Sequence, residues 1–238
     1  MNSINSCKQT PENTQRIVPD FCWDSIDKVF LDMDGTLLDK HYDDYFWEQY
    51  VPEVYANKNH VAHSEARKVL LDTYRSVENT LQWTDLDYWS ERLGLNIAEM
   101  KQEVSHLVDI RPHALNFLEY LKKIGKKTYL ITNAHPDALA VKMNRVNIRP
   151  WFEEMICSKD VGASKEQTEF WEKLQNFIPY DKETTIFADD TEKVLNSARS
   201  YGIRHLIHIA GPSSEKALSF SSVYPSIANF KELILTDS

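Results

Sequence analysis

The sequence predicts an α/β protein with a parallel sheet covered by helices on both faces and an inserted all-helical segment. Short, nearly continuous apolar runs alternate with segments whose apolar residues recur at helical spacing. One long stretch after the first run contains helical patterns and no convincing strand. The chain has 238 residues, which is enough for one large domain or two smaller ones.

Five apolar runs bounded by polar turns predict the strands. They lie at residues 29–31, 128–132, 154–157, 185–188 and 205–209. Continuous apolar character, rather than alternation of apolar and polar residues, is typical of strands that are buried on both faces. The sheet is therefore expected to be parallel and interior.

Helices are expected between these strands and in the inserted stretch. In the sheet-forming part they lie at 112–125, 136–146, 165–177 and 192–201, and in the insertion at 45–55, 64–79, 86–93 and 97–108. This pattern predicts three regions. They are a polar, loosely ordered leader at 1–22, a core at 23–41 and 109–238, and a helical cap at 42–108.

Charge and composition exclude several classes of protein. The formal net charge is −9, so a basic face for a nucleic-acid polymer is not expected. No apolar run reaches 18 residues, so we expect no membrane span. The N-terminal residues lack the pattern of a secretory signal. Cys7, Cys22 and Cys157 show no metal-type spacing, and this use of cysteine favours a cytoplasmic protein.

Acidic and polar residues follow three of the predicted strands, at the edge where open parallel sheets bind ligands. These residues are Asp32 and Asp34, Thr132 and Asn133, and Asp189 and Asp190. Four carboxylates at one edge repel one another unless a cation is present, and Mg²⁺ prefers carboxylate, water and phosphate oxygens. The sequence therefore predicts a Mg²⁺ site that handles a phosphate group.

The spacing of the first two aspartates predicts a division of roles. Asp32 and Asp34 point to the same side if the strand geometry persists. One carboxylate can accept a phosphoryl group as an aspartyl-phosphate, and the other can protonate the leaving oxygen and later activate water. Lys165, at the start of a predicted helix, can bind a phosphate oxygen, with Thr132 and Asn133 as further donors.

The run Asp32-Met33-Asp34-Gly35-Thr36-Leu37-Leu38 resembles the first motif of the haloacid dehalogenase-like (HAD) hydrolase superfamily. Thr132-Asn133, Lys165 and Asp189-Asp190 are similar to its second, third and fourth motifs, in the same order. The resemblance implies a Rossmann-like core, a helical cap inserted after the first motif, and Mg²⁺ as the cofactor. Ser164 stands where members of the superfamily commonly have proline.

The resemblance also implies a role for each motif residue. Asp32 is the nucleophile and a metal ligand, and Asp34 is the general acid and base that also offers its backbone carbonyl to the metal. Thr132 and Lys165 hold the phosphoryl group. Asp189 and Asp190 complete the metal site. Candidate phosphate- or substrate-binding residues are Gly35, Thr36, Asn133, His135 and Trp83.

Further stretches are similar to the bacterial GMP/IMP 5′-nucleotidase branch of the superfamily. They are Tyr45-Phe46-Trp47, Leu86-Asp87-Tyr88-Trp89-Ser90-Glu91, Asn133-Ala134-His135-Pro136 and Leu139-Ala140-Val141-Lys142. This resemblance implies hydrolysis of a small-molecule phosphate ester, a purine nucleoside monophosphate such as GMP or IMP.

Other interpretations remain open on the same residues. The substrate can instead be a sugar phosphate or another small phosphometabolite, and a phosphomutase on the same scaffold is a further alternative. A dehalogenase is disfavoured by Asp34, and a receiver-type signalling module by the paired acids Asp189 and Asp190, which follow the acceptor along the chain. Trp83, in a link between helices, can pack in a core, and His135 can cap a helix.

Overall fold

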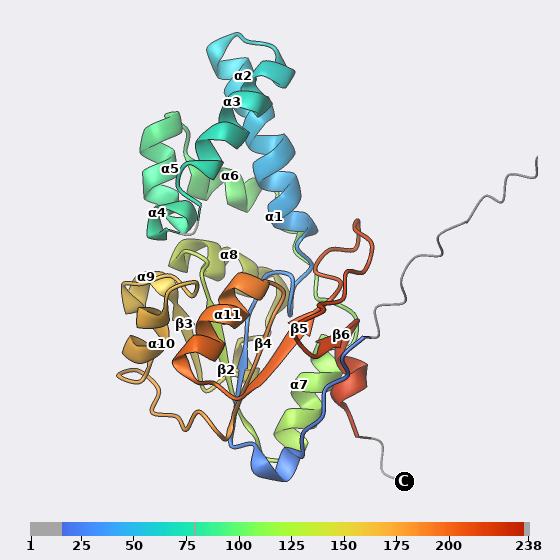
Figure 1. Ribbon diagram of the computed structural model, residues 1–238. Helices are drawn as coiled ribbons and strands as arrows, with labels where there is room; N and C mark the ends of the chain where they lie inside the picture. Colours follow the sequence, from blue (N-terminus) through green and yellow to red (C-terminus); the bar gives the residue numbers. More distant parts are fainter. Residues whose placement is uncertain (1–15, 79, 236–238) are drawn as a thin grey trace, which may run out of the picture.

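The computed structural model describes residues 16–78 and 80–235. Within these residues six parallel strands form one sheet, and a separate group of helices lies above one of its edges (Figure 1). The strands are β1 (Lys28–Leu31), β2 (Lys127–Thr132), β3 (Glu154–Cys157), β4 (Thr185–Asp189), β5 (His205–Ile209) and β6 (Ser226–Ile227). All five predicted strands are confirmed. The two-residue β6 is too short to produce a periodic signal.

The strand order is β3-β2-β1-β4-β5-β6, the order of a doubly wound Rossmann sheet. The central strand β1 pairs with β2 and β4, and Leu31 lies beside both Leu130 and Ala188. Because of this register, the residues that follow β1 leave the sheet at the same level as the ends of its two neighbours. The carboxyl ends of three strands therefore meet at one point.

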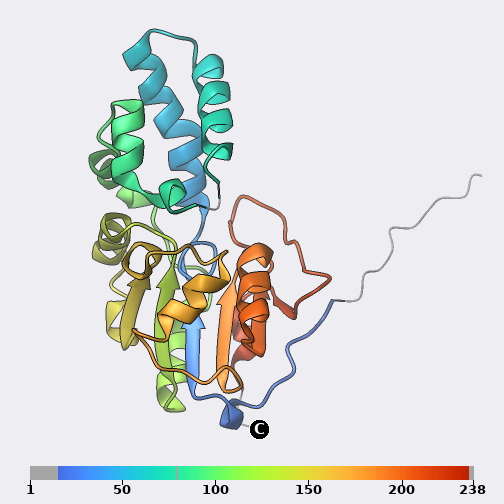
Figure 2. The ribbon, with the colours of Figure 1, turned by 60° about the vertical axis from the view of Figure 1, so that its left-hand side comes forward.

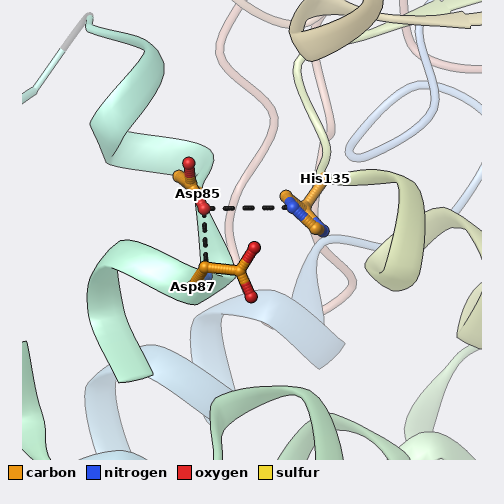
Figure 3. A group of neighbouring side chains, drawn as sticks. All are labelled: Asp85, Asp87 and His135. Atoms are coloured by element: carbon orange, nitrogen blue, oxygen red, sulfur yellow. Dashed lines mark hydrogen bonds and ion pairs between the residues drawn. The ribbon is translucent and has the colours of Figure 1, made fainter. Parts of the chain in front are cut away.

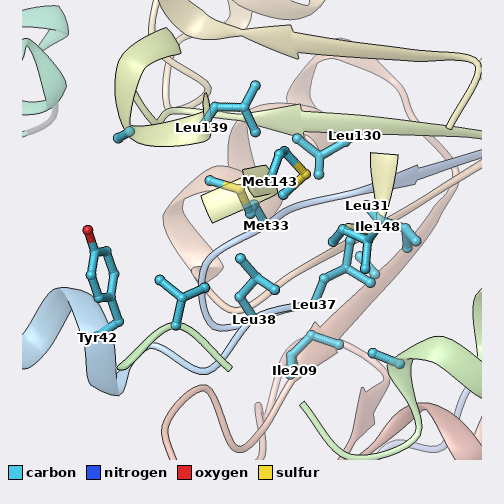
Figure 4. Close-up of a cluster of buried hydrophobic side chains, with 14 of the residues drawn as sticks. Leu31, Met33, Leu37, Leu38, Tyr42, Leu130, Leu139, Met143, Ile148 and Ile209 are labelled. Carbon is cyan, nitrogen blue, oxygen red and sulfur yellow. The ribbon is translucent and has the colours of Figure 1, made fainter. Parts of the chain in front are cut away.

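Helices cover both faces of the sheet. They are α7 (Ala114–Lys123), α8 (Pro136–Val146), α9 (Ser158–Val161), α10 (Thr168–Leu174) and α11 (Glu192–Tyr201). Alternate residues of β1 enter different cores: Leu31 packs in a layer with Leu130 and Met143 (Figure 4), and Phe30 packs in a second core with Trp171. This two-residue alternation is what a strand buried on both faces produces.

The helix predicted at 165–177 is shorter than expected. It begins at Thr168, and Lys165 lies in a turn before it rather than at its start. The indole of Trp171 donates a hydrogen bond to the backbone oxygen of Lys165 (3.1 Å), and Asn133 holds the backbone N–H of Lys165 (2.9 Å). These tertiary contacts hold Lys165 in a turn, although the apolar spacing of the sequence predicts a helix there.

The inserted stretch is helical, as predicted, and forms a group of its own above the carboxyl edge of the sheet (Figures 1 and 2). Its elements are α1 (His41–Tyr45), a π-helical turn η2 (Phe46–Tyr50), α2 (Val51–Asn59), α3 (His63–Arg75), α4 (Leu81–Thr84), α5 (Leu86–Leu93), α6 (Ile97–Glu103) and the 3-10 turn η3 (Ser105–Leu107). Trp83 lies in the short helix α4 rather than in a link.

The chain enters and leaves the helical insertion through two adjacent segments. Asp39 donates its backbone N–H to the oxygen of Asp109 (2.9 Å), and Leu38 forms an isolated antiparallel bridge with Ile110. The two crossing points therefore lie side by side, as expected for a domain inserted into a core. We keep 42–108 as the proposed extent of the cap.

Residues 1–15 of the predicted leader lie outside the described residues. The remainder of the leader contacts the far edge of the sheet: Arg16 donates to the backbone oxygen of Ser226 (2.8 Å), and Ser226 donates its N–H to the oxygen of Ile17 (2.9 Å). Among the described residues no helix combines the length and the apolar character needed to cross a bilayer.

Candidate active site

Three carboxylates meet at the carboxyl ends of β1 and β4. One oxygen from each of Asp32, Asp189 and Asp190 lies within 4.8 Å of the others. Asp32 and Asp189 are almost fully buried, at 5% and 1% exposure. The carboxylate of Asp34, two residues after Asp32, is not part of this group. The structure thus brings together the three side chains expected to ligate a metal.

Two lysines neutralise part of this acidic centre. The ammonium group of Lys165 lies 2.5 Å from Asp32 Oδ1 and 2.7 Å from Asp189 Oδ2, and it also donates to the backbone oxygen of Ile131 (3.2 Å). Lys40 Nζ lies 2.8 Å from Asp190 Oδ2. Three carboxylates therefore face two ammonium groups, which leaves room in the charge balance for a further cation.

The electrostatics of the centre favour a cation. Burial raises the pKa of Asp32 to about 7, opposed by the ammonium of Lys165 and increased further by Asp189 and Asp190. Burial raises the pKa of Asp189 to about 6 in the same way. Burial alone would lower the pKa of Lys165, but Asp189 and Asp32 outweigh it and raise that pKa. Ionised carboxylates at this depth are stabilised by positive charge.

Gly35 and Thr36 shape the turn after β1 without lining the cavity described below. Gly35 has a φ of +82°, a backbone region that side chains disfavour. Thr36 is fully buried, and its hydroxyl has no hydrogen-bond partner within the described part of the chain. The structure therefore places both residues under the site rather than at its surface.

The end of β2 organises the loop that carries Lys165. Asn133 accepts the backbone N–H of Lys165 with Oδ1 (2.9 Å) and donates from Nδ2 to Glu166 Oε2 (3.0 Å). Thr132 Oγ1 accepts the backbone N–H of Ala134 (3.0 Å). Asn133 thus holds the loop that carries Lys165. The sequence predicted Asn133 only as a hydrogen-bond donor to the phosphate of the substrate.

Ser164 replaces the proline that the family pattern has before its lysine. The backbone N–H of Ser164 donates to Gln167 Oε1 (3.3 Å), and its oxygen accepts the N–H of Gln167 (2.9 Å). A proline could not donate the first of these hydrogen bonds. The loop is therefore held here by Gln167 in place of a fixed ring.

A cavity of about 430 Å³ lies between this centre and the helical insertion. This volume is in the range of small-molecule sites. The cavity is lined from below by the acidic centre and by Thr132, Asn133, His135 and Lys165, and from above by cap residues that include Trp47, Tyr74, Trp83 and Trp89. Asp34 also lines it, so nine of the predicted site residues face one space and Gly35 and Thr36 do not.

His135 lies at the contact between core and cap, where it meets Asp85 across the gap (Figure 3). Its Nδ1 accepts the backbone N–H of Asp137 and so caps α8 (3.3 Å). Oxygens of Asp85 and Asp87 and a nitrogen of His135 lie close enough to hold a metal ion. The ammonium of Lys159, 2.6 Å from His135 Nε2, already supplies a positive charge there.

Trp83 both packs in the cap and faces the cavity. Its ring lies 6.0 Å from that of Tyr74 and 6.4 Å from that of Trp89, edge to face in both cases. Trp89 Nε1 donates to the backbone oxygen of Trp83 (2.8 Å). The packing interpretation and the substrate interpretation of Trp83 are therefore compatible.

Sequence reasoning missed a second group of buried charges beside the cavity. Lys142 Nζ lies 2.6 Å from Asp34 Oδ1 and 2.6 Å from Asp43 Oδ2, and Lys101 Nζ lies 2.9 Å from Asp43 Oδ1. A signal was present: on α8, Lys142 shares the buried face with Ala138, Leu139 and Met143. A charged residue inside an apolar stripe needs a buried partner.

The comparisons with known proteins agree with this architecture. Residues 26–202 match the sequence model of the haloacid dehalogenase-like hydrolase family. The chain is 38% identical over 212 residues to the GMP/IMP nucleotidase YrfG of Escherichia coli (strain K12), covering 89% of this chain and 96% of that protein.

Solved structures with low sequence identity share the fold. The HAD phosphatase from Thermococcus onnurineus is similar with a TM-score of 0.72 at 20% identity, covering 87% of this chain and 96% of that one. The L-2-haloacid dehalogenase from Xanthobacter autotrophicus is similar with a TM-score of 0.54 at 18% identity, covering 80% of each chain. These two likenesses concern the fold alone.

The protein has a Rossmann-like sheet with acidic side chains and a lysine at its carboxyl edge, and inserted helices lie above that edge. This is the architecture of enzymes that bind their ligands at the ends of parallel strands. The chain belongs to the haloacid dehalogenase-like hydrolase family. The family and the fold class predicted from the sequence are thereby confirmed.

Proposed function

We propose that this protein is a Mg²⁺-dependent phosphomonoester hydrolase, a 5′-nucleotidase that acts on purine nucleoside monophosphates such as GMP and IMP. The observation that carries the proposal is the convergence of Asp32, Asp189, Asp190 and Lys165 beneath a cavity of ligand size. The substrate class comes from the similar nucleotidase of Escherichia coli.

The chemistry of the site supports a small phosphate ester as substrate. Lys165 and the side chains at the end of β2 supply donors for phosphate oxygens at the floor of the cavity. The aromatic side chains of the cap, Trp83 among them, offer flat apolar surface for a base. His135, at the contact between core and cap, is proposed to border the same substrate.

The donor set fits Mg²⁺, which is bound by a few carboxylates together with phosphate oxygens. Asp32, Asp189 and Asp190 would hold the ion with their carboxylates, and the resemblance to the family adds the backbone carbonyl of Asp34. Because burial raises the pKa of Asp32 and of Asp189, added positive charge favours the ionised form of both carboxyl groups. When bound, the ion neutralises charge on the phosphate group.

The side chains of this chain divide the reaction into two steps. A carboxylate oxygen of Asp32 forms a bond to phosphorus while the ester oxygen leaves and takes a proton from Asp34, which gives the alcohol and an aspartyl-phosphate. Asp34, now ionised, removes a proton from a water molecule that attacks the phosphorus. Phosphate is released and Asp32 is restored. Thr132 and Lys165 bind the phosphoryl oxygens in both steps.

The predicted location in the cytoplasm is part of the proposal. Cys157 and Cys22 are free thiols in the structure, which is the usual state of cysteines in a reducing compartment. The proposed partners are small-molecule phosphate esters, with no nucleic-acid polymer and no membrane among them.

The test is release of phosphate from GMP and IMP by the purified protein, with Mg²⁺ and after its removal by a chelator. We expect hydrolysis that requires Mg²⁺ and is lost in Asp32→Asn. Asp181→Asn is a matched control, because Asp181 is exposed, does not line the cavity and accepts the backbone N–H of Glu183 (2.8 Å). After a single turnover in ¹⁸O-water, label is expected in the released phosphate and not in Asp32, because the water attacks phosphorus rather than the carboxyl carbon of the aspartyl-phosphate.

Three outcomes would contradict parts of the proposal. Failure to hydrolyse GMP, IMP and a generic aryl phosphate in the presence of Mg²⁺ overturns it. Hydrolysis confined to sugar phosphates retains the chemistry and replaces the substrate. Conversion of a sugar 1-phosphate into its 6-phosphate without release of phosphate favours the phosphomutase alternative.

A further inference from the structure

A continuous chain of ion pairs runs from the active site into the helical cap. It connects Asp34, Lys142, Asp43 and Lys101, and we call these four residues the Asp34 network. The successive distances between nitrogen and oxygen are 2.6, 2.6 and 2.9 Å. Lys142 belongs to α8 of the core, whereas Asp43 and Lys101 belong to α1 and α6 above it.

The two lysines of the network are buried, and the charges of the network balance when Asp34 is ionised. Lys142 and Lys101 are 1% and 2% exposed, which is exceptional for lysine. The two ammonium groups face two carboxylates. Burial alone would raise the pKa of Asp43, but the two lysines outweigh it and hold that pKa well below its usual range. Asp43 is therefore held as an anion between the two lysines.

Packing leaves Lys142 and Lys101 little freedom to move. The ammonium of Lys142 lies 5.2 Å from the centre of the Tyr42 ring, and that of Lys101 lies 4.2 Å from the Phe46 ring. The hydroxyl of Tyr42 donates to the backbone oxygen of Lys101 (2.9 Å). Side chains locked in this way hold the groups they contact in one geometry.

The contact with Lys142 orients the carboxyl group of Asp34. Oxygen Oδ1 is buried and contacts Lys142 as an ion pair without hydrogen-bond geometry, yet the side chain of Asp34 is 23% exposed and lines the cavity. The exposed area therefore belongs to the other atoms of the side chain. With Oδ1 turned to Lys142, the second oxygen, Oδ2, is the one left for the substrate.

We propose that Lys142, held in place by Asp43, is a positioning residue that directs the Asp34 carboxyl toward the leaving oxygen of the substrate. The proposal rests on the proposed function, in which Asp34 protonates that oxygen. A buried ion network is a weak source of stability, since desolvation offsets much of the attraction. Its place beside the proposed proton donor points instead to a role in alignment, on which proton transfer depends steeply.

The leaving group distinguishes positioning of a proton donor from a general structural role. A nucleoside is a poor leaving group and needs a proton as its bond to phosphorus breaks, whereas p-nitrophenolate leaves without one. The measurement is kcat/KM for GMP and for p-nitrophenyl phosphate in saturating Mg²⁺, because kcat/KM reports the steps up to the first phosphoryl transfer. The variants are Lys142→Met and Asp43→Asn.

We expect Lys142→Met to lower kcat/KM for GMP about 100-fold, at the low end of what a positioned proton donor contributes, with little change for p-nitrophenyl phosphate. Asp43→Asn keeps the shape of the side chain and is expected to give a smaller loss with the same selectivity. If Lys142→Met does not fold, Asp43→Asn tests the proposal in its place. Equal losses for the two substrates, or no loss for either, overturn the proposal.

Two further variants tighten the test. In an Asp34→Asn background, Lys142→Met is expected to cost nothing more for GMP, because a residue that acts through Asp34 has no effect once the acid is gone. Lys173→Met, which removes a surface lysine paired with Glu169 on α10, is expected to leave the activity on both substrates unaffected. Inactivity of the wild-type protein on both substrates overturns the proposed function and this inference together, whereas unselective variants overturn this inference alone.

Discussion

Gly35 lies directly against the carboxylate of Asp190: a Cβ atom at Gly35 would lie 2.7 Å from Asp190 Oδ2 and 2.9 Å from the Cβ of Pro212. The same Asp190 oxygen is held by Lys40 Nζ at 2.8 Å. Asp190 is thus confined between a lysine on one side and a glycine backbone on the other. The position of Asp190, a proposed metal ligand, therefore depends on residue 35 being a glycine without a side chain.

Gly35→Ala is therefore expected to displace Asp190 and weaken Mg²⁺ binding. Because the φ of Gly35 is positive, alanine there causes backbone strain that lowers the free energy of unfolding by roughly 1–2 kcal/mol. The overpacking against Asp190 and Pro212 adds about 1–3 kcal/mol. Chemical denaturation and the Mg²⁺ concentration that gives half-maximal phosphatase activity measure the two effects.

Gly125→Ala is the matched control, because Gly125 also has a positive φ, +70°, and a Cβ there meets nothing within 4 Å. It should lose stability through backbone strain alone and keep the Mg²⁺ requirement of the wild-type protein. If Gly35→Ala shows an unchanged Mg²⁺ requirement, the role given to the Gly35–Asp190 contact is wrong.

Stabilisation of the fold by Mg²⁺ is expected to increase with pH. Burial raises the pKa of Asp32 to about 7 and of Asp189 to about 6, so without metal both keep protons that unfolded aspartates have lost. The free energy of unfolding of the metal-free protein should then fall as pH rises from about 4 to about 7. Mg²⁺ needs the ionised carboxylates and offsets this loss at the upper end of the range.

The measurement is the shift of the thermal midpoint on adding saturating Mg²⁺, at about pH 5 and about pH 8. The shift should be small at the lower pH and large at the higher one. In Asp189→Asn the large shift should disappear. An equal shift at both pH values would show that the metal does not compete with protons on these carboxylates.

Local sequence patterns predicted the parts of the site that local geometry determines. Asp32 and Asp189 follow strands whose ends the sheet register brings together, so strand prediction alone placed them in one centre. The turn around Lys165 could not be predicted, because Asn133, far away along the chain, holds its backbone. Lys142 was missed because its partner Asp43 lies on an inserted helix whose docking the sequence does not specify.

The two cysteines of the described residues should differ sharply in reactivity. Burial raises the pKa of the Cys157 thiol to about 12, with a further increase from Asp160, and the side chain lies in the core. Cys22 is exposed. Since the thiolate is the reactive form, iodoacetamide should modify Cys22 in the native protein and leave Cys157 unmodified until unfolding.

Peptide mass spectrometry of protein labelled with and without denaturant measures this difference. Labelling of Cys157 in the denatured protein is the internal control, because it shows that this thiol reacts with iodoacetamide once it is exposed. Rapid native labelling of Cys157 would contradict the tight packing around β3.

Tyr74→Phe is expected to leave the stability of the protein unchanged or to raise it by up to about 1 kcal/mol. Tyr74 is 4% exposed, and its hydroxyl has no hydrogen-bond partner within residues 16–78 and 80–235. A buried hydroxyl without a partner costs free energy on folding, and phenylalanine removes that cost while it keeps the ring contacts with Trp89 and Trp47.

Tyr180→Phe is the matched control for this prediction. Tyr180 is also buried, at 8% exposure, but its hydroxyl donates to the backbone oxygen of Trp171 (2.9 Å). Loss of that hydrogen bond should destabilise the protein by about 0.5–1.5 kcal/mol. Denaturation of the ligand-free proteins measures both variants, and a Tyr74→Phe variant as destabilised as Tyr180→Phe would mean that the Tyr74 hydroxyl has a partner in solution.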